Sequence, residues 1–333
     1  MFTDFVKENL DSDNLEKAPT RDGYGSGLLL AGQKNDKVVA LCCDLTESTR
    51  TYKFAEEFPD RFIQVGIAEQ NMASVASGMA AMDKIPFIAS YAMFSPGRSW
   101  EQVRTTIAYN DSNVKIIGAH AGISVGPDGA THQALEDIAI MRVVPNMVVI
   151  VPSDVHEAER AVLMASEYTG PVYIRLGRSA TPVVTKPDSP FVIGKSYIAY
   201  DCNNESFFDK KIGLITTGSL LFNALFAAKE MKKHNIGVSV LHMPTIKPID
   251  TEGLLEFSSR HDFLATLEEH QVAGGLGSVV SEFLSETKPK KIIKIGIKDR
   301  FGESGEPEEL MSHFGLDVKG IVSTLQKSAS DLN

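Results

Sequence analysis

The chain has 333 residues, enough for about two domains. Its 43 acidic and 33 basic side chains leave a formal net charge of −10 at pH 7, the wrong sign for a surface that binds nucleic acid or acidic lipid. Its three cysteines form neither a CxxC pair nor an even-numbered disulfide framework, and no stretch has the pattern of a signal peptide or a membrane-spanning helix. These features predict a soluble protein of the reducing cytoplasm.

Short runs rich in β-branched residues recur along the first half of the chain and predict buried strands. They lie at 37–43, 61–66, 85–90, 114–120, 146–151 and 171–176. Apolar residues return every three or four positions at 67–82, 99–110 and 153–168, which is typical of helices. Strands that alternate with helices predict a parallel sheet covered on both faces.

The alternation is interrupted between 177 and 211, where the sequence is marked by prolines and only weakly periodic, and it then resumes. We therefore expect two α/β domains, residues 1–190 and 191–333, with the boundary within 177–211. Each domain should be a mostly parallel sheet covered by helices. In the second domain, the glycines of 274–277 lack the lysine and hydroxyl of a phosphate-binding loop and predict close packing.

In open α/β sheets, ligands bind beyond the carboxyl ends of the strands, and the loops at 44–50, 66–71 and 120–133 are unusually polar. Glu69 follows one of these strands, about one turn into an apolar helix of small residues. A buried carboxyl there is costly without a partner, which suggests a functional acid. An acid near a helix start is also favoured by the helix dipole, and the spacing alone leaves both interpretations open.

His120 and His132 bracket the loop at 120–133, and either can donate, accept or transfer a proton. Hydrogen-bonded scaffolding is the alternative interpretation of both. Their spacing of twelve, with no cysteine or third ligand nearby, disfavours a metal site. Asp128, between them, belongs to a Pro-Asp-Gly turn that needs no function to explain it.

Four arginines, at 21, 50, 175 and 178, fall in or beside the predicted loops. Guanidinium groups suit phosphate, so together they indicate an anionic substrate. Taken singly, each can equally pair with one of the abundant acids.

Several ordered motifs together resemble the transketolase family. DLTEST, GIAEQN, GPDGATHQALEDIAIMRVVPNM and RLGRS resemble its pyrimidine-binding domain, while TTGS and LEEHQVAGGLGS are similar to its carboxyl-terminal domain. The resemblance covers about residues 20 to 325. It implies a thiamine-diphosphate-dependent enzyme, and it identifies the chain with the carboxyl-terminal half-subunit of a split transketolase.

The resemblance also implies roles for single residues. Glu69 matches the glutamate that binds N1′ of the cofactor's aminopyrimidine. The aromatic residue that stacks on this ring is Phe94, with Tyr91 as the second choice, because SYAMFSPGRSW departs from the family's pattern in this segment. The residues that match substrate-binding positions are Arg21, Ser48, His120, Asp128, His132 and Arg178, of which His132 is also catalytic.

Transketolases hold the diphosphate and Mg²⁺ through a GDG motif, and no GDG occurs in this sequence. The resemblance therefore implies an amino-terminal partner subunit that carries the metal, in an α₂β₂ assembly built around a dimer. The expected reaction is transfer of a two-carbon ketol unit from a ketose phosphate to an aldose phosphate. Three alternatives remain: a deoxyxylulose-phosphate-synthase-like subunit, the beta subunit of a 2-oxo-acid dehydrogenase, and a non-catalytic regulatory homologue.

Overall fold

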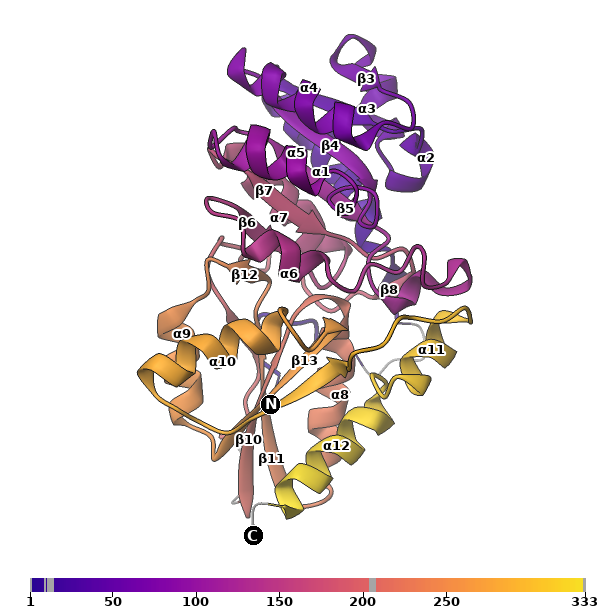
Figure 1. Ribbon diagram of the computed structural model, residues 1–333. Helices are drawn as coiled ribbons and strands as arrows, with labels where there is room; N and C mark the ends of the chain where they lie inside the picture. The colour runs from indigo at the N-terminus through magenta and orange to yellow at the C-terminus, as the bar shows by residue number, and fades with distance from the viewer. Residues whose placement is uncertain (1, 9, 11–14, 204–207, 332–333) are drawn as a thin grey trace.

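The computed structural model describes every residue except 1, 9, 11–14, 204–207 and 332–333. Two helix-covered sheets lie one beyond the other, and we call them, with their helices, the upper and lower lobes as they appear in Figure 1. A two-stranded ribbon of β1 (Lys17–Ala18) and β8 (Thr181–Pro182) forms a third, small sheet. The predicted fold class, two α/β units with mostly parallel sheets, is confirmed.

The upper sheet has the strand order β12-β6-β7-β5-β4-β2-β3. All of its pairs are parallel except β12 with β6. The strands are β2 (Val38–Cys42), β3 (Phe62–Gln64), β4 (Ile85–Tyr91), β5 (Lys115–Ala119), β6 (Val148–Ile150), β7 (Val172–Arg175) and β12 (Thr245–Lys247). The first six lie within or within one residue of the predicted runs, because each run is short, apolar and rich in β-branched residues.

Helices cover both faces of this sheet. One face carries α1 (Thr20–Lys34), α3 (Tyr52–Glu57) and α7 (Val155–Glu167), and the other carries α4 (Glu69–Ala81), α5 (Trp100–Gln102) with a π-helical turn at Val103–Ala108, and α6 (Asp137–Arg142). α1 and α7 pack so closely that a Cβ atom on Gly23 would lie 2.1 Å from the Val155 carbonyl oxygen. Glycine is therefore required at this contact.

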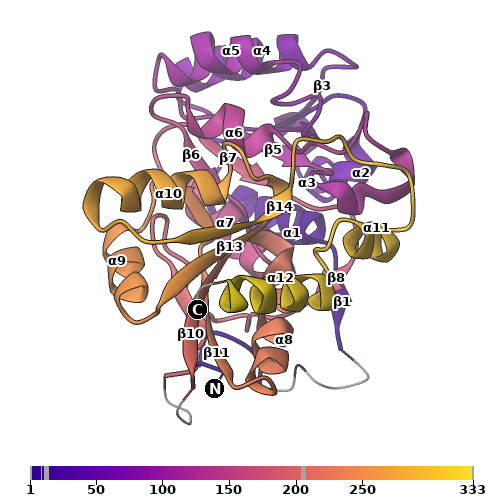
Figure 2. The same ribbon diagram turned by 60° about the horizontal axis from the view of Figure 1, so that its bottom comes forward.

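The lower sheet has the order β14-β13-β10-β11-β9, in which only β9 is antiparallel. Its strands are β9 (Tyr197–Tyr200), β10 (Lys210–Thr216), β11 (Ile236–His242), β13 (Phe263–Gln271) and β14 (Ile292–Ile297). Its helices are α8 (Leu221–Lys232), α9 (Thr251–Ser259), α10 (Leu276–Thr287), α11 (Pro307–His313) and α12 (Val318–Ser330). Figure 2 shows α12 and α8 on the same side of this sheet.

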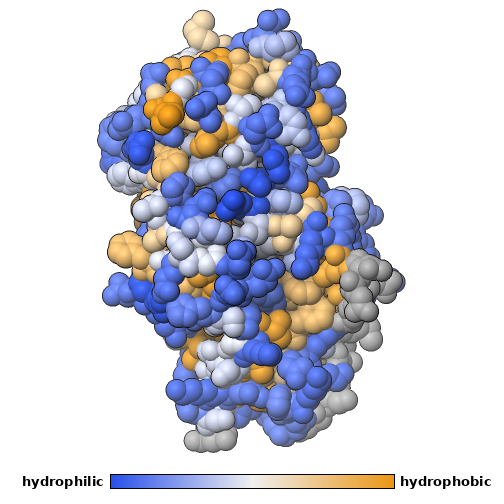
Figure 3. Space-filling view, turned by 90° about the vertical axis from the view of Figure 1, so that its right-hand side faces the viewer, coloured by the Kyte–Doolittle hydropathy of each residue, from blue (hydrophilic) through white to orange (hydrophobic). Residues whose placement is uncertain are grey.

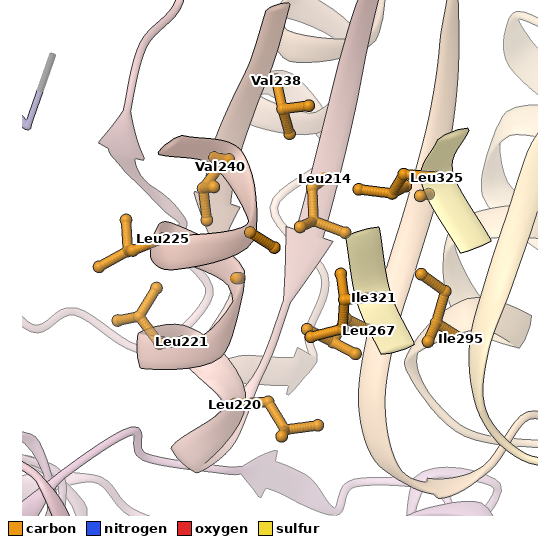
Figure 4. Packing of buried hydrophobic residues seen from close by; sticks show 14 of the residues in the cluster. Leu214, Leu220, Leu221, Leu225, Val238, Val240, Leu267, Ile295, Ile321 and Leu325 are labelled. Atoms are coloured by element: carbon orange, nitrogen blue, oxygen red, sulfur yellow. The ribbon is translucent and has the colours of Figure 1, made fainter. Parts of the chain in front are cut away.

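Leucine, isoleucine and valine side chains fill the space between the lower sheet and the helices α8 and α12 (Figure 4). Leu214 and Val240 from the strands meet Leu221 and Leu225 from α8 there. Burying such side chains contributes about 1.5–3 kcal/mol each. By contrast, the molecular surface shown in Figure 3, which is the right-hand side of Figure 1, is largely hydrophilic, with hydrophobic residues in small groups among polar ones.

The second half of the chain contributes one strand to the upper sheet. β12 comes from the second half of the sequence but pairs with β6 at the edge of the upper sheet, in the register Thr245 to Ile150 and Lys247 to Val149. The division into 1–190 and 191–333 stays a prediction, and β12 shows that the segments on either side of it interlock. Among the described residues, no helix is long and apolar enough to cross a membrane, and all three cysteines are buried and free of disulfides.

Candidate active site

The loops after β2, β4, β5 and β7 meet at one edge of the upper sheet, because parallel strands bring their carboxyl ends together. The predicted site residues gather at this edge. Hydrogen bonds and ring contacts join one set of them: Arg21, Ser48, His120, Tyr91, Phe94 and His132. An ion pair joins Asp128 and Arg178, and the charge of Arg178 acts on His120.

Glu69 is the first residue of α4, and only 2% of its surface is exposed. The Ser90 hydroxyl donates to its Oε1 at 3.2 Å, and the Arg98 guanidinium lies 3.7 Å from its Oε2. Oε2 is buried, and within the described part of the chain it accepts no hydrogen bond. Such a buried acceptor without a donor is costly, so this oxygen is suited to a hydrogen bond from a ligand.

Aromatic rings cluster near Arg98, the residue that approaches this acid. The Tyr91 and Phe94 rings are stacked, with centroids 5.8 Å apart and planes inclined by 18°. His120 stacks on Tyr91 at 3.8 Å, and His132 meets the Phe94 ring edge-on at 5.5 Å. One face of Tyr91 is therefore covered by a protein side chain.

His120 directly follows β5 and lies in the left-handed region, with φ of 54°; it is 1% exposed. Burial, followed by the Arg21 and Arg178 guanidinium groups, lowers its pKa to about 3, so the imidazole is neutral at physiological pH. Arg21 can only donate, and its NH1 lies 3.2 Å from Nε2 of His120. Nε2 is thus the acceptor, Nδ1 carries the proton, and this N–H has no partner within the described residues.

Arg21 lies in the first turn of α1 and donates from NH1 to the Ser48 carbonyl oxygen at 2.9 Å. Its Nε is buried and makes no hydrogen bond to the described residues. Burial, and then the neighbouring Arg50 guanidinium, lower the pKa of Arg21, which means that the cation is incompletely compensated here. An anion bound at this point would be stabilised.

The loop at 120–133 holds the other polar groups. Arg178 donates from NH1 to the Val125 carbonyl oxygen at 2.7 Å and lies 3.5 Å from Oδ1 of Asp128. The Thr131 hydroxyl is 2.9 Å from Nδ1 of His132. Both Asp128 and Arg178 keep about a third of their side-chain surface exposed, at 32% and 37%, so both remain accessible to a ligand.

Arg175 is different from Arg178. It is buried, and its Nε donates to Asp137 at 2.9 Å while its NH2 donates to the carbonyl oxygens of Ala134 and Glu269. The Tyr173 hydroxyl donates to the same Asp137 carboxylate at 2.6 Å. Arg175 therefore has a structural role between the lobes.

The glycines of 274–277 pack closely, as predicted. Both carboxylate oxygens of Glu268 accept backbone hydrogen bonds at the start of α10, from Leu276 at 2.7 Å and from Gly277 at 2.8 Å. A Cβ atom on Gly275 would lie 1.9 Å from Glu268 Oε2. Glu269 in turn accepts from the Ser124 backbone N–H at 2.7 Å, so this segment is a contact between the lobes.

Arg98 is a site residue that the sequence reasoning missed. Its guanidinium lies near Glu69 and 5.5 Å from the centroid of Phe94, so it joins the acid to the aromatic wall. The only signal was its position in SYAMFSPGRSW, the segment already noted for its unusual pattern. Within the described ranges, no group of three or more His, Cys, Asp or Glu side chains is arranged to hold a metal ion.

Comparison with known families identifies the two lobes. Residues 16–184 match the transketolase pyrimidine binding domain, and residues 208–321 match the transketolase C-terminal domain. The chain belongs to the transketolase family. The resemblance predicted from the motifs is thereby confirmed, and a pyrimidine-binding domain implies thiamine diphosphate as the cofactor.

Several relatives cover nearly the whole chain. A putative transketolase C-terminal section from Methanocaldococcus jannaschii is 43% identical over 310 residues, 92% of this chain and 95% of that protein. A 6-deoxy-6-sulfo-D-fructose transketolase subunit from Clostridium sp. is 37% identical over 92% of this chain and 94% of its own. An apulose-4-phosphate transketolase subunit from Phocaeicola vulgatus is 35% identical over 91% of this chain and 95% of its own.

A solved structure gives the same relationship. A split gene transketolase in the form of an inactive beta4 tetramer superposes with a TM-score of 0.84 at 42% sequence identity. The match covers 94% of this chain and 98% of that one.

Proposed function

We propose that this chain is the subunit of a split transketolase that binds the cofactor's pyrimidine, and that it transfers a two-carbon ketol unit from a ketose phosphate to an aldose phosphate. The observation that carries the proposal is the buried Glu69 carboxylate, whose Oε2 accepts no hydrogen bond from the described residues. Arg98 lies between this acid and the Phe94 ring. Relatives that are themselves a transketolase section and transketolase subunits support it.

The orphaned groups fit thiamine diphosphate. Glu69 would hold the aminopyrimidine at N1′ through Oε2, and Phe94 would present a flat apolar face to the ring. We favour Phe94 over Tyr91 because Tyr91 stacks on two other rings, those of His120 and Phe94, whereas Phe94 stacks on Tyr91 alone among the described residues. The bound cofactor supplies the carbon centre that carries the transferred unit. Glu69 contributes by holding and moving the proton at N1′.

The remaining residues would bind the sugars. His120 donates from Nδ1–H to a substrate oxygen, and its low pKa keeps it a neutral donor. His132 contacts reacting oxygens as a second donor or acceptor, while Asp128 accepts from a hydroxyl group.

Arg21 and Arg178 would bind the anionic end of the sugar, at the position marked by the Ser48 carbonyl. The two transketolase relatives are named for a sulfo-sugar and a sugar phosphate, both of which end in an anion. The choice of sugar phosphates as donor and acceptor remains part of the proposal.

The partner would carry the diphosphate and Mg²⁺ site, since no GDG motif occurs in the sequence. Two copies of each subunit would form a cytoplasmic α₂β₂ assembly, with the cofactor between the pyrimidine domain of one unit and the partner's diphosphate domain.

The test is ketol transfer from xylulose 5-phosphate to ribose 5-phosphate with thiamine diphosphate and Mg²⁺, using this chain alone and then mixed with a GDG-containing amino-terminal subunit. We expect activity only in the mixture. Glu69→Gln should lower kcat by about 10²-fold or more while the circular dichroism spectrum is unchanged. Glu286→Gln, a change on an exposed part of α10, is the matched control.

Other outcomes would redirect the assignment. Activity with pyruvate as donor would favour the deoxyxylulose-phosphate-synthase-like alternative, and transfer to a lipoyl group would favour the dehydrogenase. A Glu69→Gln variant with wild-type turnover would refute the role of this acid.

A further inference from the structure

The loop at 120–133 packs against the lower lobe. Its 3₁₀ segment, Ile123–Asp128, packs against α11 of the lower lobe, at the right of Figure 1. A Cβ atom on Gly129 would lie 2.4 Å from the Ser304 hydroxyl oxygen, and one on Gly126 would lie 3.3 Å from the Gly305 carbonyl oxygen. The loop of the upper lobe and residues 302–305 of the lower lobe thus fit together closely.

Gln133 joins these two loops. It is 2% exposed, and its Nε2 donates to three backbone carbonyl oxygens: Ile123 and Gly126, each at 3.2 Å, and Glu303 at 2.9 Å. Two of these belong to the upper lobe's loop and one to the lower lobe. A single carboxamide therefore joins the two segments, with its two N–H protons shared among three carbonyl oxygens.

The other end of the carboxamide is equally confined. Oε1 of Gln133 is buried and accepts no hydrogen bond from the described residues. A Cβ atom on Gly302 would lie 1.7 Å from it, so residue 302 must be glycine for the chain to approach this oxygen. The fold thus pairs the glutamine of ATHQ with the glycine of RFGES, far along the chain, a relation that no local pattern displays.

We propose that Gln133 is a positioning residue through which the lower lobe sets the substrate-binding shape of the loop. The loop carries Asp128, its Val125 carbonyl receives Arg178, and His132 precedes Gln133 directly. A shift of residues 302–305 would move these three polar groups together. The inference rests on the proposed function only in calling the loop substrate-binding.

The geometry assigns the effect to sugar binding. Gln133 contacts the loop at 120–133 and residues 302–303, and the polar groups on this loop are those proposed to bind the substrate's hydroxyl groups and anion. Loss of the Gln133 hydrogen bond to Glu303 should raise KM for both sugar phosphates by about tenfold, as expected for one lost hydrogen bond that positions the loop, and leave kcat within about threefold. A purely structural role would lower the amount of folded enzyme and leave KM unchanged.

The experiment uses the assembled enzyme with three variants. Gln133→Met removes the donor and keeps the volume, Gly302→Ala displaces the lower-lobe loop from Oε1, and Gln33→Met is the matched control on the exposed side of α1. We expect Gln133→Met and Gly302→Ala to raise KM by similar factors. The KM of the double variant should be little higher than that of either single variant, because both changes disrupt the same contact between Gln133 and residues 302–303. Unchanged KM in Gly302→Ala, or additive effects, would overturn the proposal.

Hydrogen exchange gives a readout that does not depend on activity. Gly302→Ala, a change in the lower lobe, should accelerate amide exchange in the peptide 121–134 of the upper lobe, while Gln33→Met should not. If the wild-type mixture is inactive, the proposed function fails, yet this measurement still decides the coupling. Unaltered exchange in 121–134 would refute it.

Discussion

Replacing Arg175 with methionine should destabilise the protein strongly, whereas the same change at Arg178, three residues later, should not. Arg175 is buried, 7% exposed, and holds the Asp137 carboxylate, which is 2% exposed, at 2.9 Å. Methionine keeps much of the side-chain volume but removes the charge. It leaves a buried carboxylate whose remaining hydrogen-bond partner among the described side chains is the Tyr173 hydroxyl. The carbonyl oxygens of Ala134 and Glu269 also lose the Arg175 donor, although that of Ala134 still accepts from the Gly122 backbone N–H.

Removing one partner of a buried ion pair costs about 3–5 kcal/mol, because the remaining charge stays in a poorly solvating interior. An unfolding entropy of about 2.1 cal/mol/K per residue over 333 residues gives ~1.4 °C per kcal/mol, so this corresponds to a fall in Tm of about 4–7 °C. Arg178 is 37% exposed and its partner is 3.5 Å away, so its contribution should lie below about 1 kcal/mol. Its loss should instead raise KM for the sugar phosphates.

The assay is urea and thermal unfolding followed by circular dichroism and by the fluorescence of Trp100, the only tryptophan in the sequence. Its Nε1 donates to the Ile140 carbonyl oxygen of α6, the helix that also carries Asp137, so it reports on the right region. Measurements at several protein concentrations separate the effect from subunit association. A Tm for Arg175→Met within about 2 °C of the wild type would refute the reasoning.

Three further outcomes are expected. Burial and Arg21 hold the pKa of His120 near 3, below its usual 6.5, so below about pH 6.5 this histidine is protonated in the unfolded chain but not in the folded one. The free energy of unfolding should therefore fall as the pH drops. In urea unfolding at pH 7 and 4.5, the fall in the free energy of unfolding should be smaller for His120→Asn than for the wild type. Burial raises the pKa of Glu268 to about 7, so its contribution is present below pH 4.5 and lost as pH rises through 7, and the Tm of Glu268→Gln relative to the wild type should increase between pH 5 and 8. Phe94→Ala should weaken thiamine diphosphate binding to the assembled enzyme, by about tenfold in a calorimetric titration, and Tyr91→Ala by clearly less.

The local features of this protein could be predicted from its sequence. The strands at 85–90 and 114–120 were found nearly to the residue because β-branched runs between helices leave few alternatives. The set of loops that builds the site also follows from the parallel topology, because strand order fixes which ends meet. The identity of Glu69 as the acid needed more than spacing, since a helix start alone can explain it.

The features that could not be predicted are non-local. Strand β12 has three residues, too few for a periodic pattern, and it forms because an edge of another lobe is available. Arg98 reaches Glu69 through a side-chain direction that no motif specifies. The contacts of Gln133 depend on a lower-lobe carbonyl 170 positions away. The segment at 99–110 was predicted as one helix, but it is a short α-helical turn followed by a π-helical one.

The strand β12 limits how the second half of the chain can be removed or replaced. In a polypeptide ending near residue 190, β6 would keep its pairing with β7 but become an edge strand, and its backbone groups that face β12 could pair with another molecule. It would also lose Lys247, whose ammonium group donates to the carbonyl oxygens of Arg142 and Val144 beyond α6. A chimera with a foreign second half would therefore need a strand that completes this edge.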